Sequence, residues 1–178
     1  LAIARKLAVI TGGPGTGKTS TVVKILDILL EESPELIIKL VAPTGKAAMR
    51  LSDSIDEWAA TREKKFQVQT LHRLLGMRKD GRTWRHGPQN QVKVDLLIVD
   101  EASMIDLTMM HRLLGALPDH TRLILLGDPN QLPSVDTGNV LADLCAGEPG
   151  FSSTFGELAS NFVGEVQTVE RSHHLTDS

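Results

Sequence analysis

Residues 12–19, GGPGTGKT, have the composition and spacing of a phosphate-binding loop. They match the pattern G-x-x-x-x-G-K-[ST] and directly follow an apolar run at residues 6–11. Small residues let successive backbone N–H groups wrap phosphate oxygens, while a lysine reaches the outer phosphates and a hydroxyl binds Mg²⁺. The residues expected to contact a nucleotide in this stretch are Gly12, Gly13, Pro14, Gly15, Thr16, Gly17, Lys18, Thr19 and Ser20.

Two adjacent acids end another apolar run, LLIVDEAS at residues 96–103. Asp100 is suited to holding Mg²⁺, usually through its water, so Asp100 and Thr19 are the expected metal-facing residues. Glu101 is suited to polarising an attacking water, which is worth about 10²–10⁴ in rate. Such a pair can also simply cap the following helix, but the phosphate loop in the same chain favours catalysis.

A third apolar run breaks into the polar turn LGDPNQLPSV at residues 126–135. Turn formation explains Gly127 and Pro129 but gives no reason for Gln131. A neutral amide at the carboxyl end of a strand can bond the last phosphate or the hydrolytic water without adding charge. The expected catalytic residues are therefore Lys18, Glu101 and Gln131.

The element pattern predicts an α/β fold with a parallel β-sheet flanked by helices. Four apolar, hardly alternating runs at 6–11, 36–42, 94–100 and 121–127 are typical of strands buried on both faces. Amphipathic helical patterns follow the first two runs and lie between the last two. With 178 residues, 41% of them hydrophobic, the chain has the size of one domain, 1–178. Beyond Cys145 only EVQTVE, residues 165–170, has the pattern of a strand.

Charge is unevenly distributed along the chain. The net charge is −3, yet residues 62–93 contain nine Lys or Arg against two acids, a local balance of +7 that leaves −10 elsewhere. Within this region the segment 78–92 fits no core pattern, and its Asp80-Gly81 and Gly87-Pro88 pairs indicate turns. The sequence predicts a basic surface excursion, which either attracts phosphates or is merely solvated.

Two further stretches have the composition of phosphate contacts. VAPTGKAAMRL at 41–51 and QTLHRLLG at 69–76 each place a threonine before a helical pattern, whose first N–H groups can bind a backbone phosphate. Hydroxyls, amides and basic side chains favour contacts to phosphate and sugar over base readout. His72 fits a structural role as well. The expected DNA-binding residues are Pro43, Thr44, Gly45, Lys46, Thr70 and His72.

The motifs GGPGTGKT, APTGKAA, TLHRLLG, DEASMIDL and LGDPNQLPSVDTG, in this order, resemble those of superfamily 1 helicases. They are most similar to the RecD type, the alpha chain of exodeoxyribonuclease V, from about Lys6 to Leu144. The resemblance implies a RecA-like P-loop ATPase domain that uses ATP and Mg²⁺ and moves on single-stranded DNA with 5′→3′ polarity. It also implies the beta and gamma chains of a DNA repair and recombination nuclease as partners, with double-stranded DNA as the unwound substrate.

The chain departs from the family in its last residues. The family's phosphate-contacting arginine is expected near ERSHHLTDS, where His174 stands instead and Arg171 is offset by three positions. The adenine-contacting glutamine of the family falls before Leu1, and the second RecA-like domain also lies outside this sequence. A nucleotide-gated binding module without sustained turnover is therefore the alternative function, although Glu101 favours catalysis. A third alternative, a P-loop kinase, does not account for the presence of Glu101 and Gln131.

Cysteine content and hydropathy suggest the compartment. Cys145 has no partner for an internal disulfide, which favours a reducing bacterial cytoplasm, and no apolar run approaches the roughly 18 residues of a membrane span. Because Leu1 is not an initiator methionine, the chain is expected to be a fragment.

Overall fold

The computed structural model describes residues 6–13, 15–60, 66–131 and 140–146. The chain divides into two compact units, Leu1–Asp143 and Leu144–Ser178, and the fold described below is that of the first. Its strands are β1 (Leu7–Thr11), β2 (Ile38–Ala42), β3 (Val68–Thr70), β4 (Leu96–Val99) and β5 (Arg122–Gly127). Its helices are α1 (Lys18–Glu32), α2 (Gly45–Ala60), α3 (Leu71–Leu75), the 3-10 turn η1 (Ala102–Met104) and α4 (Leu107–Gly115), and α5 (Val140–Cys145) begins within it.

The five strands form one parallel sheet in the order β1-β5-β4-β2-β3, which confirms the predicted α/β fold with a parallel sheet and flanking helices. The four predicted strands are all present. The sequence analysis missed β3, because its three residues, Val68–Thr70, form no apolar run. Strand order matters for the site, since β5 lies between β1 and β4 and its carboxyl end therefore emerges between theirs.

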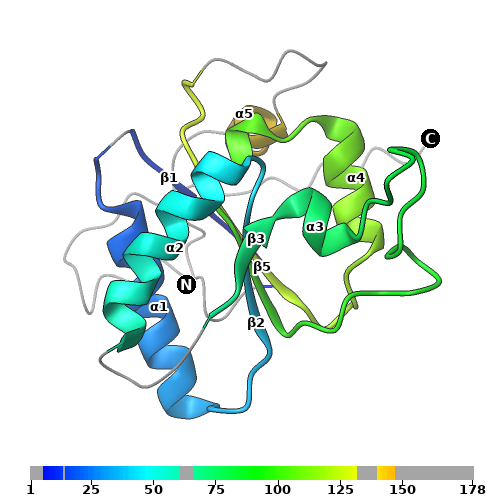
Figure 1. The fold of residues 1–178 in the computed structure, drawn as a ribbon. Helices are drawn as coiled ribbons and strands as arrows, with labels where there is room; N and C mark the ends of the chain where they lie inside the picture. Colours follow the sequence, from blue (N-terminus) through cyan, green and yellow to red (C-terminus); the bar gives the residue numbers. More distant parts are fainter. Residues whose placement is uncertain (1–5, 14, 61–65, 132–139, 147–178) are drawn as a thin grey trace, which may run out of the picture. The chain divides into compact units, whose positions relative to one another are not determined.

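Helices cover both faces of the sheet, as Figure 1 shows. On one face Ile98 and Ile124 pack into a core with α1 and α2. On the other face the next residues along the strands, Val99 and Leu125, pack into a core with α3 and α4. Because alternate side chains serve two different cores, the central strands are apolar at nearly every position.

Particular side chains define the start of one helix and the packing of two others. Helix α4 starts after Asp106, whose carboxylate accepts a hydrogen bond of 2.7 Å from the backbone N–H of Met109. Helix α1 buries Val22, Ile25, Leu26 and Leu29 on one face, and Leu30 is partly buried. The indole N–H of Trp58 on α2 donates to the Asp27 carboxylate on α1 at 3.1 Å, which ties these helices together.

The basic segment after α3 is a surface excursion, as predicted, but it is shorter than expected. Antiparallel bridges pair Met77 with Trp84 and Gly87 with Asn90. Val92, at the end of the predicted excursion, is instead 3% exposed and belongs to the core. The sequence predicts a surface position for Val92 because it follows a stretch of polar residues and forms no apolar run with them.

Two local features shape the first turn of the excursion. Gly76 has φ +68, and a Cβ there would lie 2.6 Å from the Cβ of Arg85, so the chain can turn here only at a glycine. The Asp80 carboxylate accepts hydrogen bonds from the Thr83 hydroxyl and from the backbone N–H groups of Thr83 and Arg82. These bonds favour the charged form and lower the pKa of Asp80 to about 2.

Several expectations fall outside the described residues. They are the strand at 165–170 and the role of Arg171, His173 and His174 near the end of the chain. In the parts of the chain that the structure describes, no helix is long and apolar enough to cross a membrane.

Candidate active site

The phosphate loop connects the carboxyl end of β1 to the first turn of α1. The backbone N–H of Gly12 donates to the carbonyl of Gly127 at 3.2 Å, which fixes the start of the loop to the end of β5. Gly15 and Gly17 have φ +74 and +82, conformations that glycine adopts without a steric cost. The Lys18 ammonium donates to the carbonyl oxygens of Gly12 at 2.6 Å and Gly13 at 2.9 Å, and so folds over the loop.

A pocket of about 420 Å³ opens beside this loop, a volume within the usual range for small-molecule sites. One wall is the loop and the start of α1, and a second is one face of α2. The acidic pair closes the pocket from β4. The lining residues are Gly15, Thr16, Gly17, Lys18, Thr19, Ala47, Arg50, Leu51, Ser54, Asp100 and Glu101.

The acidic pair lies where β4 ends, and the two acids have different environments. Asp100 accepts a hydrogen bond of 2.9 Å from the backbone N–H of Glu101. Burial raises the pKa of Asp100, while that hydrogen bond and the positive charge of Lys18 act in the opposite direction. Glu101 has φ 52 and ψ 39, and is the one non-glycine residue with positive φ among those described. Such a conformation typically costs about 1–3 kcal/mol and is common at functional sites.

Gln131 lies in the turn after β5, and this turn is built by Asp128. The Asp128 carboxylate accepts from the backbone N–H of Asn130 at 2.9 Å, and its carbonyl accepts from that of Gln131 at 3.1 Å. The side chain of Gln131 accepts a hydrogen bond of 3.1 Å from the hydroxyl of Ser103. Gln131 therefore stands beside the acidic-pair loop and does not line the phosphate pocket itself.

A second hollow of about 350 Å³ adjoins the first. The two share Ala47, Arg50 and Glu101, so they meet at the start of α2 and at the second acid. The second hollow is completed by Thr44, Lys46, Met104 and Gln131. The structure thus brings Lys18, Asp100 and Glu101 to one pocket and Gln131 to its neighbour.

The two threonines expected to contact DNA occupy equivalent places after neighbouring strands. Thr44 follows β2 and accepts a hydrogen bond of 3.2 Å from the backbone N–H of Ala47. Thr70 ends β3 and accepts one of 3.3 Å from the backbone N–H of Arg73. In both cases the hydroxyl caps a helix by accepting, which leaves its own O–H proton available as a donor to phosphate.

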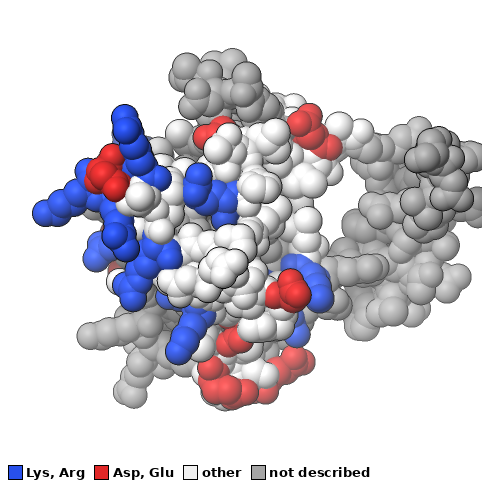
Figure 2. All heavy atoms as spheres, turned by 90° about the vertical axis from the view of Figure 1, so that its right-hand side faces the viewer, with Lys and Arg blue, Asp and Glu red and all other residues white. Residues whose placement is uncertain are grey.

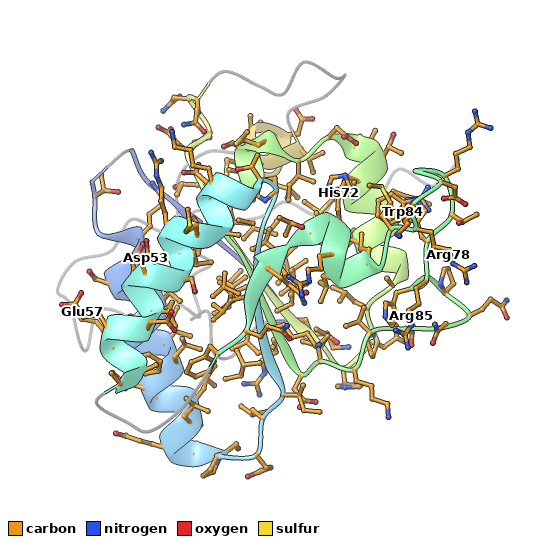
Figure 3. The ribbon with its side chains drawn as sticks, in the orientation of Figure 1. Asp53, Glu57, His72, Arg78, Trp84 and Arg85 are labelled. Carbon is orange, nitrogen blue, oxygen red and sulfur yellow. The ribbon has the colours of Figure 1, made fainter. Side chains whose placement is uncertain are left out.

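His72 lies against an aromatic and basic cluster. Its ring centroid is 5.7 Å from that of Trp84, and the Arg112 guanidinium stacks 4.7 Å from the centre of the same indole. Figure 3 shows His72 and Trp84 together at α3, with Arg78 and Arg85 on the excursion beyond them and Asp53 and Glu57 on the far side of α2. These contacts give His72 a packing role, and its predicted DNA contact stays a prediction.

Positive side chains gather on the face of the molecule that carries the excursion. Figure 2 shows this concentration of Lys and Arg side chains. The contributing residues are exposed, and they are Arg73, Arg78, Lys79, Arg82, Arg85 and Lys93. The local excess of positive charge in the sequence is therefore a surface feature next to Thr70 and His72.

The remaining predicted site residues that the structure describes do not line these pockets. Gly12 and Gly13 hold Lys18 through their carbonyls, Ser20 is exposed on α1, and Pro43 and Gly45 flank Thr44 at the start of α2. Pro14 lies outside the described residues.

Sequence reasoning missed several residues of the site, of which Arg50 and Ser103 carry polar groups that matter for its chemistry. Arg50 lies within the quoted stretch 41–51, but which way its side chain faces depends on the rotation of α2 about its own axis. Ser103 is part of DEAS, and its 1% exposure together with its bond to Gln131 appears only in the folded chain.

The residues present fit a magnesium-bound nucleotide. A Cβ on Gly12 would lie 2.5 Å from the Thr16 hydroxyl, so the loop is shaped around a backbone that side chains would obstruct. No group of three or more His, Cys, Asp or Glu that could hold a metal is found in the described part of the chain. Mg²⁺ usually takes one or two protein ligands and completes its shell with water and phosphate. Thr19 and Asp100, which line the same pocket, would be those ligands.

A phosphate loop after β1, an acidic pair after β4 and a polar turn after the strand between them define a P-loop nucleotide-binding domain with a RecA-like fold. Residues 1–137 match the family described as AAA domain. The RecBCD enzyme subunit RecD of Mycolicibacterium smegmatis is 45% identical over 96% of this chain. The ATP-dependent RecD2 DNA helicase of Deinococcus radiodurans is 43% identical over 84% of this chain. The chain belongs to the AAA domain family and is similar over most of its length to RecD-type helicases.

The chain spans 31% of the length of the first of these relatives and 19% of the second. Among solved structures, Dbp5 of S. cerevisiae bound to RNA and ADP BeF3 matches over 94% of this chain and 42% of its own, with a TM-score of 0.51 and 17% identity. At that identity the likeness supports the fold alone.

Proposed function

We propose that this domain is the ATP-hydrolysing motor domain of a DNA helicase, which couples Mg-ATP hydrolysis to movement along single-stranded DNA. The observation that carries the proposal is the arrangement of the two adjoining hollows. One is lined by Lys18, Thr19 and Asp100, and the other by Thr44 and Gln131, with Glu101 lining both. This arrangement supports chemistry on a phosphate on one side of the Glu101 carboxylate and contact with a DNA backbone on the other.

Nucleotide binding rests on the loop and on charge. The backbone N–H groups of the loop and the start of α1 attract phosphate oxygens, because they carry partial positive charge that no intrahelical carbonyl neutralises. Lys18 adds a full charge in the same pocket. To bind a phosphate, its ammonium exchanges the carbonyls of Gly12 and Gly13 for phosphate oxygens. Mg²⁺, when bound, neutralises the charge of the phosphate oxygens.

Hydrolysis rests on Glu101 and Gln131. The Glu101 carboxylate takes a proton from the attacking water as general base. Its positive φ sets the direction of the side chain at the point where β4 turns into η1. Gln131, held by Ser103, offers amide N–H groups at the edge of the second hollow, where they report whether the last phosphate is present.

DNA binding rests on the edge that continues from the second hollow along β2 and β3. Thr44 and Thr70 offer hydroxyl donors, Lys46 offers charge, and the basic excursion beyond His72 extends the phosphate-attracting surface. Phosphate contacts of this kind are independent of base sequence, as a translocating protein requires.

The finer parts of the proposal are supported by resemblance. The RecD protein of M. smegmatis is named as a subunit of the RecBCD enzyme, which supports a role beside beta and gamma chains of a DNA repair nuclease. The 5′→3′ polarity is proposed because the ordered motifs resemble those of RecD-type helicases.

The test is the ATPase rate of the full-length protein with and without a single-stranded oligonucleotide. We expect stimulation by DNA, loss of hydrolysis in Lys18→Ala, and tight nucleotide retention with little phosphate release in Glu101→Gln. A rate that DNA does not change would overturn the motor proposal and favour a nucleotide-gated binding module. Preserved turnover in Lys18→Ala would overturn the assignment of the phosphate loop.

A further inference from the structure

We propose that Arg50 binds the terminal phosphate of the nucleotide as a second cationic ligand, supplied by α2 of the same domain. This inference rests on the proposed function, since it assigns a residue to the same nucleotide pocket. The phosphate loop, acidic pair and polar turn contribute no arginine to that pocket. Arg50 is the only arginine that lines either hollow within the described structure.

Helix α2 presents one continuous face to the phosphate pocket. Ala47, Arg50, Leu51 and Ser54 all line it, and their spacing of i, i+3, i+4 and i+7 corresponds to a single helical stripe. On this stripe Leu51 is 2% exposed and anchors the helix to the core, whereas Arg50 is exposed to solvent. The position of Arg50 beside the pocket is therefore set by the packing of its neighbour and does not depend on a loop.

Arg50 stands where the two hollows meet. Together with Ala47 and Glu101 it lines both of them. Glu101, the acid proposed to activate water, lies on the same boundary, and Gln131 lines the second hollow beside it. A group that bonds the phosphate being cleaved belongs at this boundary, because the attacking water and the phosphate must meet beside Glu101.

Among the described residues, Lys18 and Arg50 are the two cations that line the phosphate pocket. The positive charge of Lys18 opposes the burial that raises the pKa of Asp100, and its ammonium approaches the phosphates from the loop side, where it bonds two carbonyls. Within the described residues Arg50 forms no ion pair, and its charge faces the hollows. The outer phosphate of a nucleoside triphosphate carries the most negative charge, so a second cation is of most use there.

The chemistry of the guanidinium fits this ligand better than an ammonium would. Its planar fork of N–H donors matches two oxygens of one phosphate, and such charge-assisted pairs are roughly twice as strong as neutral hydrogen bonds. An arginine that bonds only the last phosphate favours the triphosphate over the diphosphate. Loss of that phosphate would release Arg50 towards the second hollow, which Thr44, Lys46 and Gln131 line.

The test is a comparison of two ligands in the full-length protein, measured by titration of a fluorescent non-hydrolysable ATP analogue and of fluorescent ADP with Mg²⁺. Arg50→Ala should weaken binding of the ATP analogue by about tenfold or more, the usual worth of a charge-assisted hydrogen bond, and change ADP binding by less than about threefold. Arg50→Lys should recover part of the loss, since it keeps the charge without the fork. Lys24→Ala, which removes an exposed charge from α1 outside both hollows, is the matched control and should alter neither ligand.

Equal effects on the two ligands, or no effect, would overturn the assignment of Arg50. So would a loss confined to the affinity for single-stranded DNA, which would place the guanidinium on the polymer. Lys18→Ala in the same titration separates this inference from the proposed function. If Lys18→Ala still binds the ATP analogue normally, the assignment of the nucleotide site is wrong. If Arg50→Ala binds the analogue normally while Lys18→Ala binds it poorly, only the role of Arg50 is rejected. Melting temperatures of the variants report folding, and the exposed Arg50→Lys variant repeats the test with the helix surface preserved.

Discussion

The hydroxyl of Ser103 donates a hydrogen bond of 3.1 Å to the side-chain oxygen of Gln131. Ser103 follows the acidic pair by two residues and is 1% exposed, while Gln131 lies in the turn after the neighbouring strand. The bond joins η1 to the turn after β5, and its two residues are 28 positions apart in the chain. It also fixes the amide of Gln131, because the side-chain oxygen is held and the two N–H donors then face away from Ser103.

Ser103 is therefore expected to act through Gln131. Ser103→Ala should lower kcat for DNA-stimulated ATP hydrolysis by about fivefold, the equivalent of removing one hydrogen bond of about 1 kcal/mol, with little change in KM. Ser52→Ala, which removes a hydroxyl bonded to Asp56 on the outer side of α2, is the matched control and should leave kcat unchanged. The double variant Ser103→Ala, Gln131→Ala should be no slower than Gln131→Ala alone. Additive losses would show that the two residues act separately.

The left-handed backbone of Glu101 predicts a conflict between stability and activity. Glu101→Gly removes the steric cost of φ 52, whereas Glu101→Ala keeps it, so the glycine variant should be more stable than the alanine variant by about 1 kcal/mol. Both should fail to hydrolyse ATP. Chemical denaturation of the two variants measures the difference. An alanine variant as stable as the glycine variant would mean that the turn is unstrained.

The buried carboxylate of Asp100 predicts a pH-dependent cost to stability. Because burial raises the pKa of Asp100 in the folded state, the folded protein binds the proton more tightly than the unfolded chain does. The stability that this carboxyl contributes therefore falls as pH rises from its ordinary pKa to the raised one. Above that value the cost is constant. Asp100→Asn keeps an oxygen for the Glu101 N–H and removes the charge, so it should melt at a higher temperature at pH 7. The difference should shrink below about pH 4, where unfolded carboxyls are protonated. A difference that does not change with pH would exclude this origin.

The basic excursion predicts a measurable salt dependence. Changing Arg78, Lys79, Arg82 and Arg85 together to glutamine should reduce the slope of log affinity for single-stranded DNA against log salt by about 0.7 for each DNA phosphate that the protein no longer neutralises. Asp80 is kept in this variant because it holds the turn. Lys6→Gln with Lys24→Gln, both exposed outside the excursion, is the control and should leave the slope unchanged. An unaltered slope in the fourfold variant would show that the excursion faces no DNA.

The local chemistry of the site was predictable because residues adjacent in the sequence form each of its motifs. Each of these groups can be recognised from its neighbours in the chain alone: the glycines of 12–17, the lysine after them and the two acids that follow β4. Parallel strands bring their carboxyl ends to one edge of a sheet, so convergence of Lys18, Asp100 and Glu101 also followed from the α/β pattern.

Only the tertiary structure determined the positions of Gln131, Arg50 and Val92, because these depend on the order of the strands and on the rotation of the helices about their axes. Because β5 lies between β1 and β4, its turn reaches Ser103, and Gln131 joins the second hollow instead of the phosphate pocket. The phase of α2 turns Arg50 to the boundary of both hollows, and packing against the sheet buries Val92 at the end of a polar segment. A sequence specifies local backbone and periodicity residue by residue. The packing free energy of the whole core determines which distant segments come into contact. No single sequence motif encodes that free energy.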